Sequence, residues 1–108
     1  MAPHRAALKA AWDDDTVLTR VFTGRPARGI ANRIVREVGA MSEAPPEFPL
    51  AGGALMPLRG KSEPAGSGDF TPLWSGQAMR LGREMPTAEL TRVLVDETQA
   101  LLRAMAGK

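Results

Sequence analysis

The side chains best suited to contact a ligand lie at Leu73–Gln77, where the sequence reads LWSGQ. Trp74 offers a flat aromatic face and an indole N–H donor. The amide of Gln77 can both donate and accept hydrogen bonds. Gly76 lies between them and lets another molecule approach the backbone closely. On the residues alone, the favoured interpretation is packing, with Trp74 beneath a loop and the Gln77 amide satisfied within the protein.

A second candidate is a cluster of arginines within seventeen residues, namely Arg20, Arg25, Arg28, Arg33 and Arg36. We expect a helix to start near Gly29, and guanidinium groups beside a helix N-terminus attract anions. The favoured interpretation is a solvated helix face with a structural ion pair. Gly24-Arg25-Pro26 also resembles the centre of an AT-hook minor-groove peptide, but Thr23 precedes it and flanking basic repeats are absent.

The remaining reactive side chains are few. His4 is the single histidine, no partner for it can be named, and we interpret it as a surface residue. The sequence contains no cysteine, which excludes thiolate chemistry and disulfides. Gly60-Lys61-Ser62 matches only the end of a phosphate-binding loop, because Leu55 stands where the first glycine should be. We therefore assign no catalytic residue and no metal ligand.

Composition favours a peripheral segment over a self-sufficient domain. The chain has 108 residues, of which 5% are aromatic, while 11 glycines and 9 prolines supply many turns. The net charge of +2 is too small to indicate a nucleic-acid-binding protein. No apolar run reaches the roughly 18 residues of a membrane span, and the N-terminus lacks the apolar region of a secretory signal. We expect a cytoplasmic protein.

The first half of the chain predicts two helices around one strand. A short helix is expected at 3–12, and the β-branched run at 16–23 is the clearest strand. A turn follows at 24–26, because Pro26 fixes its own backbone and disfavours a helical conformation just before it. Apolar spacing then predicts a helix at 30–38.

The second half predicts loops, a linker and one long helix. An irregular loop is expected at 41–53, with a single helical turn at 54–59 and Gly-interrupted helix at 75–83. The long helix begins at Pro86 and ends near Met105. Its buried stripe is predicted to be Leu90, Val93, Leu94, Leu101, Leu102 and Met105. The chain thus divides into 1–59, a flexible linker at 60–69, and 70–108.

In order, these motifs resemble the C-terminal region of the nitronate monooxygenase family, the flavin-dependent enzymes once called 2-nitropropane dioxygenases. The resemblance rests on TVLTRVFTGRPARGIANR, APPEFPL, ALMPLRG, FTPLWSGQAMRL and REMPTAEL, and it covers about Ala7 to Leu102. It implies a mainly α fold with one or two short strands. Such a fold would be part of the small helical substrate domain, plus the last helix, of an FMN-binding (β/α)8-barrel enzyme.

The resemblance also implies a function and a site. The family oxidises alkyl nitronates with O2 by means of FMN and a catalytic histidine, and Trp74, Gly76 and Gln77 would lie beside the flavin. His4 lies outside the matching motifs and does not inherit the catalytic role. The barrel strands and the catalytic histidine would be missing, so we expect the isolated chain to bind no FMN, to be inactive and to need the barrel portion. The alternatives are a non-catalytic interaction module or, less favoured, a basic peptide that binds anions or nucleic acid.

Overall fold

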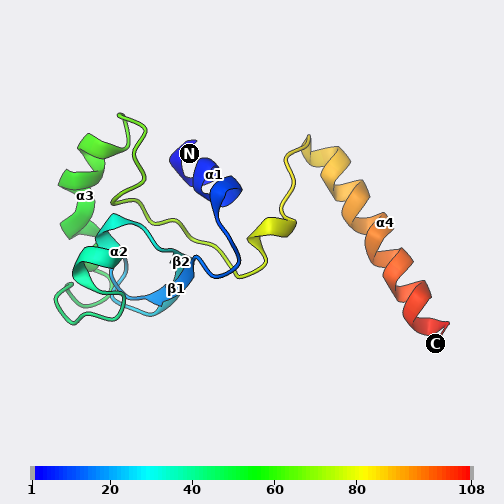
Figure 1. Ribbon diagram of the computed structural model, residues 1–108, viewed down its shortest axis with the longest axis horizontal. Coiled ribbons are helices and arrows are strands. Elements are labelled where there is room, and N and C mark those ends of the chain that lie inside the picture. Colours follow the sequence, from blue (N-terminus) through cyan, green and yellow to red (C-terminus); the bar gives the residue numbers. More distant parts are fainter. Residues whose placement is uncertain (1, 108) are drawn as a thin grey trace.

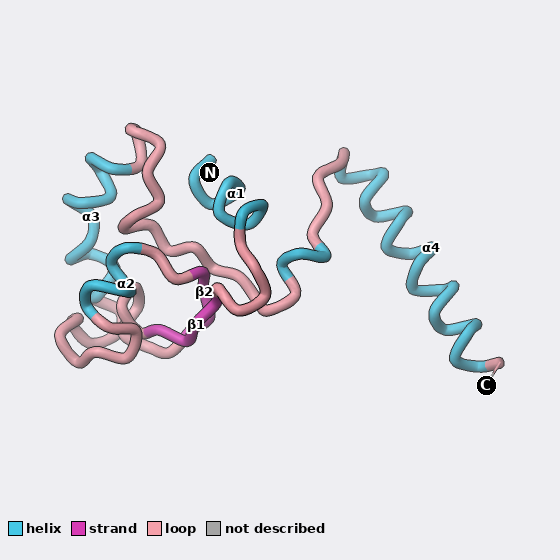
Figure 2. The backbone as a smooth tube through the Cα atoms, viewed as in Figure 1, coloured by secondary structure: helices cyan, strands magenta, loops and turns pink. Residues whose placement is uncertain are grey.

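The computed structural model describes residues 2–107 and has two unlike parts (Figure 1). Its longest dimension is 53 Å and its radius of gyration is 17.3 Å, whereas a compact domain of this length would have a radius of about 13 Å. The last helix extends away from the rest (Figures 1 and 2). The elements are α1 (Ala2–Ala10), β1 (Thr16–Thr19), β2 (Ala27–Ile30), α2 (Arg33–Val38), α3 (Ala51–Ser62), the 3₁₀ turn η1 (Met79–Leu81) and α4 (Thr87–Ala106). The predicted mainly α class with two short strands is confirmed.

The two strands pair antiparallel, with Thr16 opposite Ile30 and Thr19 opposite Ala27. The strand predicted at 16–23 is therefore twice too long. Thr19 ends the strand because its hydroxyl accepts a hydrogen bond from the Val21 N–H at 3.1 Å, and its own O–H donates to the Ala40 carbonyl at 2.8 Å. These local bonds take the place of ladder bonds and turn the chain inward.

The helix predicted at 30–38 is present as α2, but its predicted start near Gly29 is wrong, because Gly29 lies in β2 and α2 begins at Arg33. The reason is pairing between distant residues. β2 binds β1 on one side, and on the other the Ile30 N–H donates to the Leu73 carbonyl at 2.8 Å. A segment that hydrogen-bonds on both edges becomes a strand whatever its local preference.

The core lies in residues before 75, in two clusters. One consists of the buried residues Val21, Phe22, Ile34 and Val35. The other joins the end of α1 to β2 and to the LWSGQ segment, and consists of Ala11, Ile30 and Leu73. Phe22, which we expected on a strand, instead fills the first cluster with only 3% of its surface exposed.

α3 corrects three predictions. It replaces the end of the predicted loop at 41–53, extends the predicted turn at 54–59 at both ends, and takes in the first three residues of the predicted linker. An ion pair between Arg59 Nε and Glu63 Oε1 at 2.7 Å closes its end, and the Thr71 hydroxyl donates to the same carboxylate at 2.9 Å. These contacts stabilise the helix end in a way that the Gly- and Pro-rich sequence did not indicate. The division at 60–69 stays a prediction.

The region after the LWSGQ segment holds one prediction that is confirmed and two that are wrong. The long helix is present as α4, over Thr87–Ala106. The predicted helix at 75–83 is reduced to η1, flanked by Gly76 and Gly82. None of the α4 stripe is buried, although Leu90 and Val93 are half-buried. Burial requires an opposing surface, and no other element described here packs along this helix.

Candidate functional site

The LWSGQ segment starts with an isolated antiparallel bridge to β2. The Ile30 N–H donates to the Leu73 carbonyl at 2.8 Å, the Ser75 N–H donates to the Arg28 carbonyl at 3.3 Å, and Trp74 stands opposite Gly29. The backbone of residues 73–75 is thus fixed to the sheet. The chain after residue 75 therefore leaves the sheet at a fixed position and in a fixed direction.

The ring of Trp74 packs against the protein. It meets the Phe22 ring edge-on, with 5.5 Å between centroids and 83° between planes. It also covers Gly29, where an added Cβ would lie 3.4 Å from Cε3 of the indole and 3.0 Å from the Leu73 carbonyl oxygen. Trp74 is half-buried, so one side of the indole belongs to the core while part of it stays accessible. The packing interpretation therefore accounts for much of this side chain.

Gly76 and Gln77 differ from Trp74 in being exposed. Apart from Gly76 and its two chain neighbours, no residue has an atom within 4 Å of the position that a Cβ on Gly76 would occupy, so the space beside this backbone is open. Within residues 2–107 the Gln77 amide makes no hydrogen bond with the rest of the chain. The structure gives no support to the expectation that this amide is satisfied internally, and the side chain is exposed.

His4 contacts this segment, which sequence reasoning missed. Its Nε2 lies 2.8 Å from the Trp74 carbonyl oxygen, and because a carbonyl only accepts, the ring nitrogen donates. The residue is half-buried, whereas the sequence suggested a surface histidine. The two residues are seventy positions apart, and nothing in the local pattern around His4 points to Trp74.

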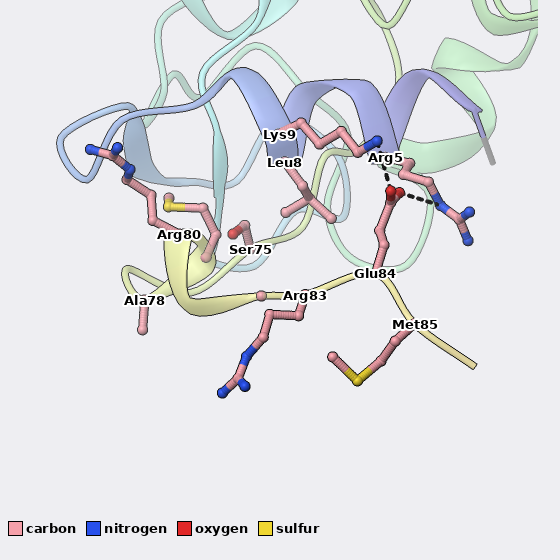
Figure 3. Close-up of a pocket in the computed structure, with 11 residues that line it drawn as sticks. Arg5, Leu8, Lys9, Ser75, Ala78, Arg80, Arg83, Glu84 and Met85 are labelled. Atoms are coloured by element: carbon pink, nitrogen blue, oxygen red, sulfur yellow. Dashed lines mark ion pairs between the residues drawn. The ribbon is translucent and has the colours of Figure 1, made fainter. Parts of the chain in front are cut away.

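Next to the segment lies a cavity of about 750 Å³ between α1 and the chain from 75 to 85 (Figure 3). Arg5 and Lys9 reach from α1 toward Glu84, with nitrogen–oxygen distances of 3.7 and 2.7 Å. The hydrogen bond from Lys9 lowers the pKa of the Glu84 carboxyl. Arg83 also lines the cavity but forms two hydrogen bonds with Glu97, at 2.8 and 2.6 Å. Arg5, Lys9 and Arg83 are therefore already engaged by carboxylates, and the Arg80 guanidinium lies 4.2 Å from the centre of the Trp12 ring.

The arginine cluster does not converge on one point. Arg28 Nη1 donates to the Thr16 hydroxyl at 3.1 Å, Arg33 pairs with Glu37 at 2.9 Å, and the Arg25 guanidinium lies 4.0 Å from the centre of the Phe48 ring. On α2, the exposed pair of Arg33 and Glu37 matches the expected solvated helix face with a structural ion pair, whereas Arg28 is half-buried in β2. The cluster gives no support to an anion site at the start of a helix.

Among residues 2–107, no three histidine or acidic side chains gather where they could hold a metal ion. None of the helices there is both long and apolar enough to cross a membrane.

Comparison with known proteins identifies the family. The family model described as "Nitronate monooxygenase" matches residues 1–97. The chain belongs to the nitronate monooxygenase family. The chain is 39% identical to the nitronate monooxygenase of Pseudomonas aeruginosa over 97 residues, which are 89% of this chain. It is 30% identical to a probable nitronate monooxygenase of Staphylococcus saprophyticus over 99 residues, which are 92% of this chain.

A solved structure agrees with the family assignment. Nitroalkane oxidase from Streptomyces ansochromogenes superposes with a TM-score of 0.81 at 38% identity, and covers 94% of this chain. The chain spans 28% of the length of the two curated relatives and 29% of the solved structure. The expected correspondence to the C-terminal region of this family is thereby confirmed.

Proposed function

We propose that this chain is the C-terminal part of a flavin-dependent nitronate monooxygenase, an oxidoreductase that oxidises alkyl nitronates with O2. The observation that carries the proposal is the family match over residues 1–97, supported by the superposition on nitroalkane oxidase. The rest of the enzyme would be the FMN-binding (β/α)8 barrel that the family resemblance implies. The substrate would be a small-molecule nitronate; we propose no nucleic-acid or membrane partner.

Within this enzyme, Trp74, Gly76 and Gln77 would form part of the wall beside the flavin. Two observations support this assignment: Gly76 leaves open space beside the backbone, and the Gln77 amide is exposed with both a donor and an acceptor. Trp74 would contribute the part of its indole that the core leaves accessible. When bound, the flavin would supply the redox chemistry, while these residues would orient its ring.

The isolated chain should not perform this chemistry. FMN binding needs several backbone N–H groups directed at the phosphate, usually from a Gly-rich turn at a helix start. The arginines near the LWSGQ segment are engaged by Glu97, by Glu84 and by the Trp12 ring. The exposed apolar side chains of α4 further support a requirement for a covering barrel portion.

Flavin titration of the isolated chain tests this requirement. We expect no saturable quenching of FMN fluorescence and no nitronate oxidation. Stoichiometric binding with a dissociation constant of about 1 μM would show that the chain holds the cofactor unaided.

Two substitutions test the flavin wall in a full-length protein that carries this region. Gln77→Ala should lower flavin content or turnover and leave the melting temperature nearly unchanged, because the side chain is exposed. Trp74→Ala should lower both turnover and stability, because the indole also packs on Phe22. If Gln77→Ala retains the flavin content and turnover of the parent, the segment serves packing alone.

A second candidate is a non-catalytic module that binds a separately encoded barrel. The exposed stripe of α4 favours it, since such a face is usually covered. The DNA upstream of the codon for Met1 separates the two: an in-frame barrel would indicate one enzyme chain, and a barrel on a separate gene would indicate the module.

A further inference from the structure

We propose that His4 is a positioning residue for the LWSGQ segment. Its imidazole would hold the Trp74 carbonyl and so fix the point from which Gly76 and Gln77 project. The relevance of that point to a flavin rests on the proposed function. The positioning itself rests on contacts within this chain.

The direction of the Trp74 carbonyl is set by the pairing of Trp74 with Gly29. Two hydrogen bonds, from Ile30 to Leu73 and from Ser75 to Arg28, flank the pair formed by Gly29 and Trp74. In an antiparallel ladder this makes Gly29 and Trp74 a non-hydrogen-bonded pair, so the N–H and C=O of Trp74 point away from β2. The carbonyl faces the outer edge of this short sheet, where a further strand would normally supply a donor.

His4 takes the place of that missing strand. Its Nε2 stands 2.8 Å from the carbonyl oxygen, an ordinary length for a hydrogen bond from nitrogen. A side chain from α1 thus completes the edge of a sheet to which α1 does not belong. An edge carbonyl tied in this way loses the freedom to tilt, which in turn restricts the peptide that leads into Ser75.

α1 itself is seated independently of this bond. Ala7, Leu8 and Ala11 pack against Leu73 and Ile30. They follow His4 by three, four and seven positions, so all four side chains lie on one face of the helix. The apolar contacts therefore fix the helix, and the histidine adds one directed bond at its end.

Asn32 holds the chain just before the LWSGQ segment. Its Nδ2 donates to the carbonyls of Gly68 and Thr71, at 2.8 Å each. Backbone bonds to β2 then continue to Ser75, and beyond it Gly76 and Gln77 are exposed. The change from fixed to free backbone falls directly after the peptide that His4 holds.

The test uses NMR on the 108-residue chain without flavin. His4→Leu keeps the bulk and removes the donor, whereas His4→Gln keeps an N–H at similar reach. Loss of one hydrogen bond should raise amide exchange at Ser75 about fivefold in His4→Leu. Exchange should return close to the parent rate in His4→Gln. Lys9→Gln is the matched control on the same helix, because it breaks the ion pair to Glu84 and not the bond to Trp74.

Three outcomes would overturn the proposal: an unprotonated Nε2 in the parent chain, an unchanged Ser75 rate in His4→Leu, or an equal rise at the core residue Val35. The last would show general destabilisation, not positioning. If His4→Leu fails to fold, the Nε2 proton and the His4→Gln rate still decide. Failure here would leave the Gln77 flavin experiment standing, and failure of that experiment would leave this result standing.

Discussion

Residues 2–75 and residues 76–107 both contain large apolar side chains, but only the first region buries them. Every buried residue of the described chain lies in the first region, between Ala11 and Leu73. In the second region Leu101 and Met105 are 65% and 68% exposed, although they sit on a regular twenty-residue helix. Local spacing suffices to form an amphipathic helix, but burial depends on an opposing surface.

The two regions also differ in their ion pairs. Arg59 and Glu63 are about one-quarter exposed and share a hydrogen-bond network with Thr71, which is fully buried. Arg83 and Glu97 are 42% and 53% exposed and bind only each other. Water and salt screen the second pair far more than the first. Charge interactions should therefore matter for folding in the first region and for helix placement in the second.

The largest expected difference comes from apolar truncation. Phe22→Ala should destabilise the chain by about 3–5 kcal/mol, because it empties part of the core cluster beneath Trp74. Leu101→Ala on α4 should change stability by less than about 0.5 kcal/mol. Urea denaturation of both variants measures the contrast. Equal losses would mean that α4 packs on the first region in solution.

A pair of glycines gives the next effect. Gly29→Ala would place a Cβ 3.0 Å from the Leu73 carbonyl oxygen and against the Trp74 ring, so we expect about 1–3 kcal/mol of destabilisation. Gly53→Ala in α3 has open space and should stabilise by about 0.4–1 kcal/mol. Thermal unfolding followed by circular dichroism measures both. A neutral Gly29→Ala would contradict the close approach of the LWSGQ segment to β2.

Acid should weaken the contacts of Glu63 in the first region. Hydrogen bonds from Arg59 and Thr71 lower the pKa of the Glu63 carboxyl. Its stabilising contribution is therefore complete above the ordinary glutamate value of about 4.3 and is lost as pH falls through the lowered pKa. Glu63→Gln should be less stable at neutral pH and lose less stability on acidification. Unfolding free energies measured across this pH range check the prediction, and parallel curves for parent and variant would refute it.

The smallest effect concerns the exposed pair of Arg83 and Glu97. We expect Glu97→Gln to leave the unfolding midpoint unchanged and to alter the direction of α4, because this pair ties the helix to the residues after η1. Small-angle X-ray scattering should show a changed radius of gyration for the variant. High salt should change the parent in the same way, and a salt-independent radius would argue against this tie.

The elements that the sequence predicted well are those decided within a few residues. The α4 helix follows from its apolar spacing and from Pro86 at its start. In α2, the apolar spacing also indicated the two buried residues, Ile34 and Val35. Such patterns act over one or two helical turns. The resemblance to the nitronate monooxygenase family could also be recognised from the sequence, and it rests on the order of several motifs and not on any single one.

Tertiary structure decided the rest, because the deciding contacts join residues far apart in the chain. β2 is a strand since both its edges bind other segments, and α3 ends where Glu63 meets Thr71. α1 and the LWSGQ segment both flank β2. This arrangement decides that Gln77 is exposed and that His4 contacts Trp74. By itself the sequence determined the long helix α4, the apolar spacing of α2 and the family. Which strand edges meet, and which polar atoms face outward, depended on packing across seventy residues of chain.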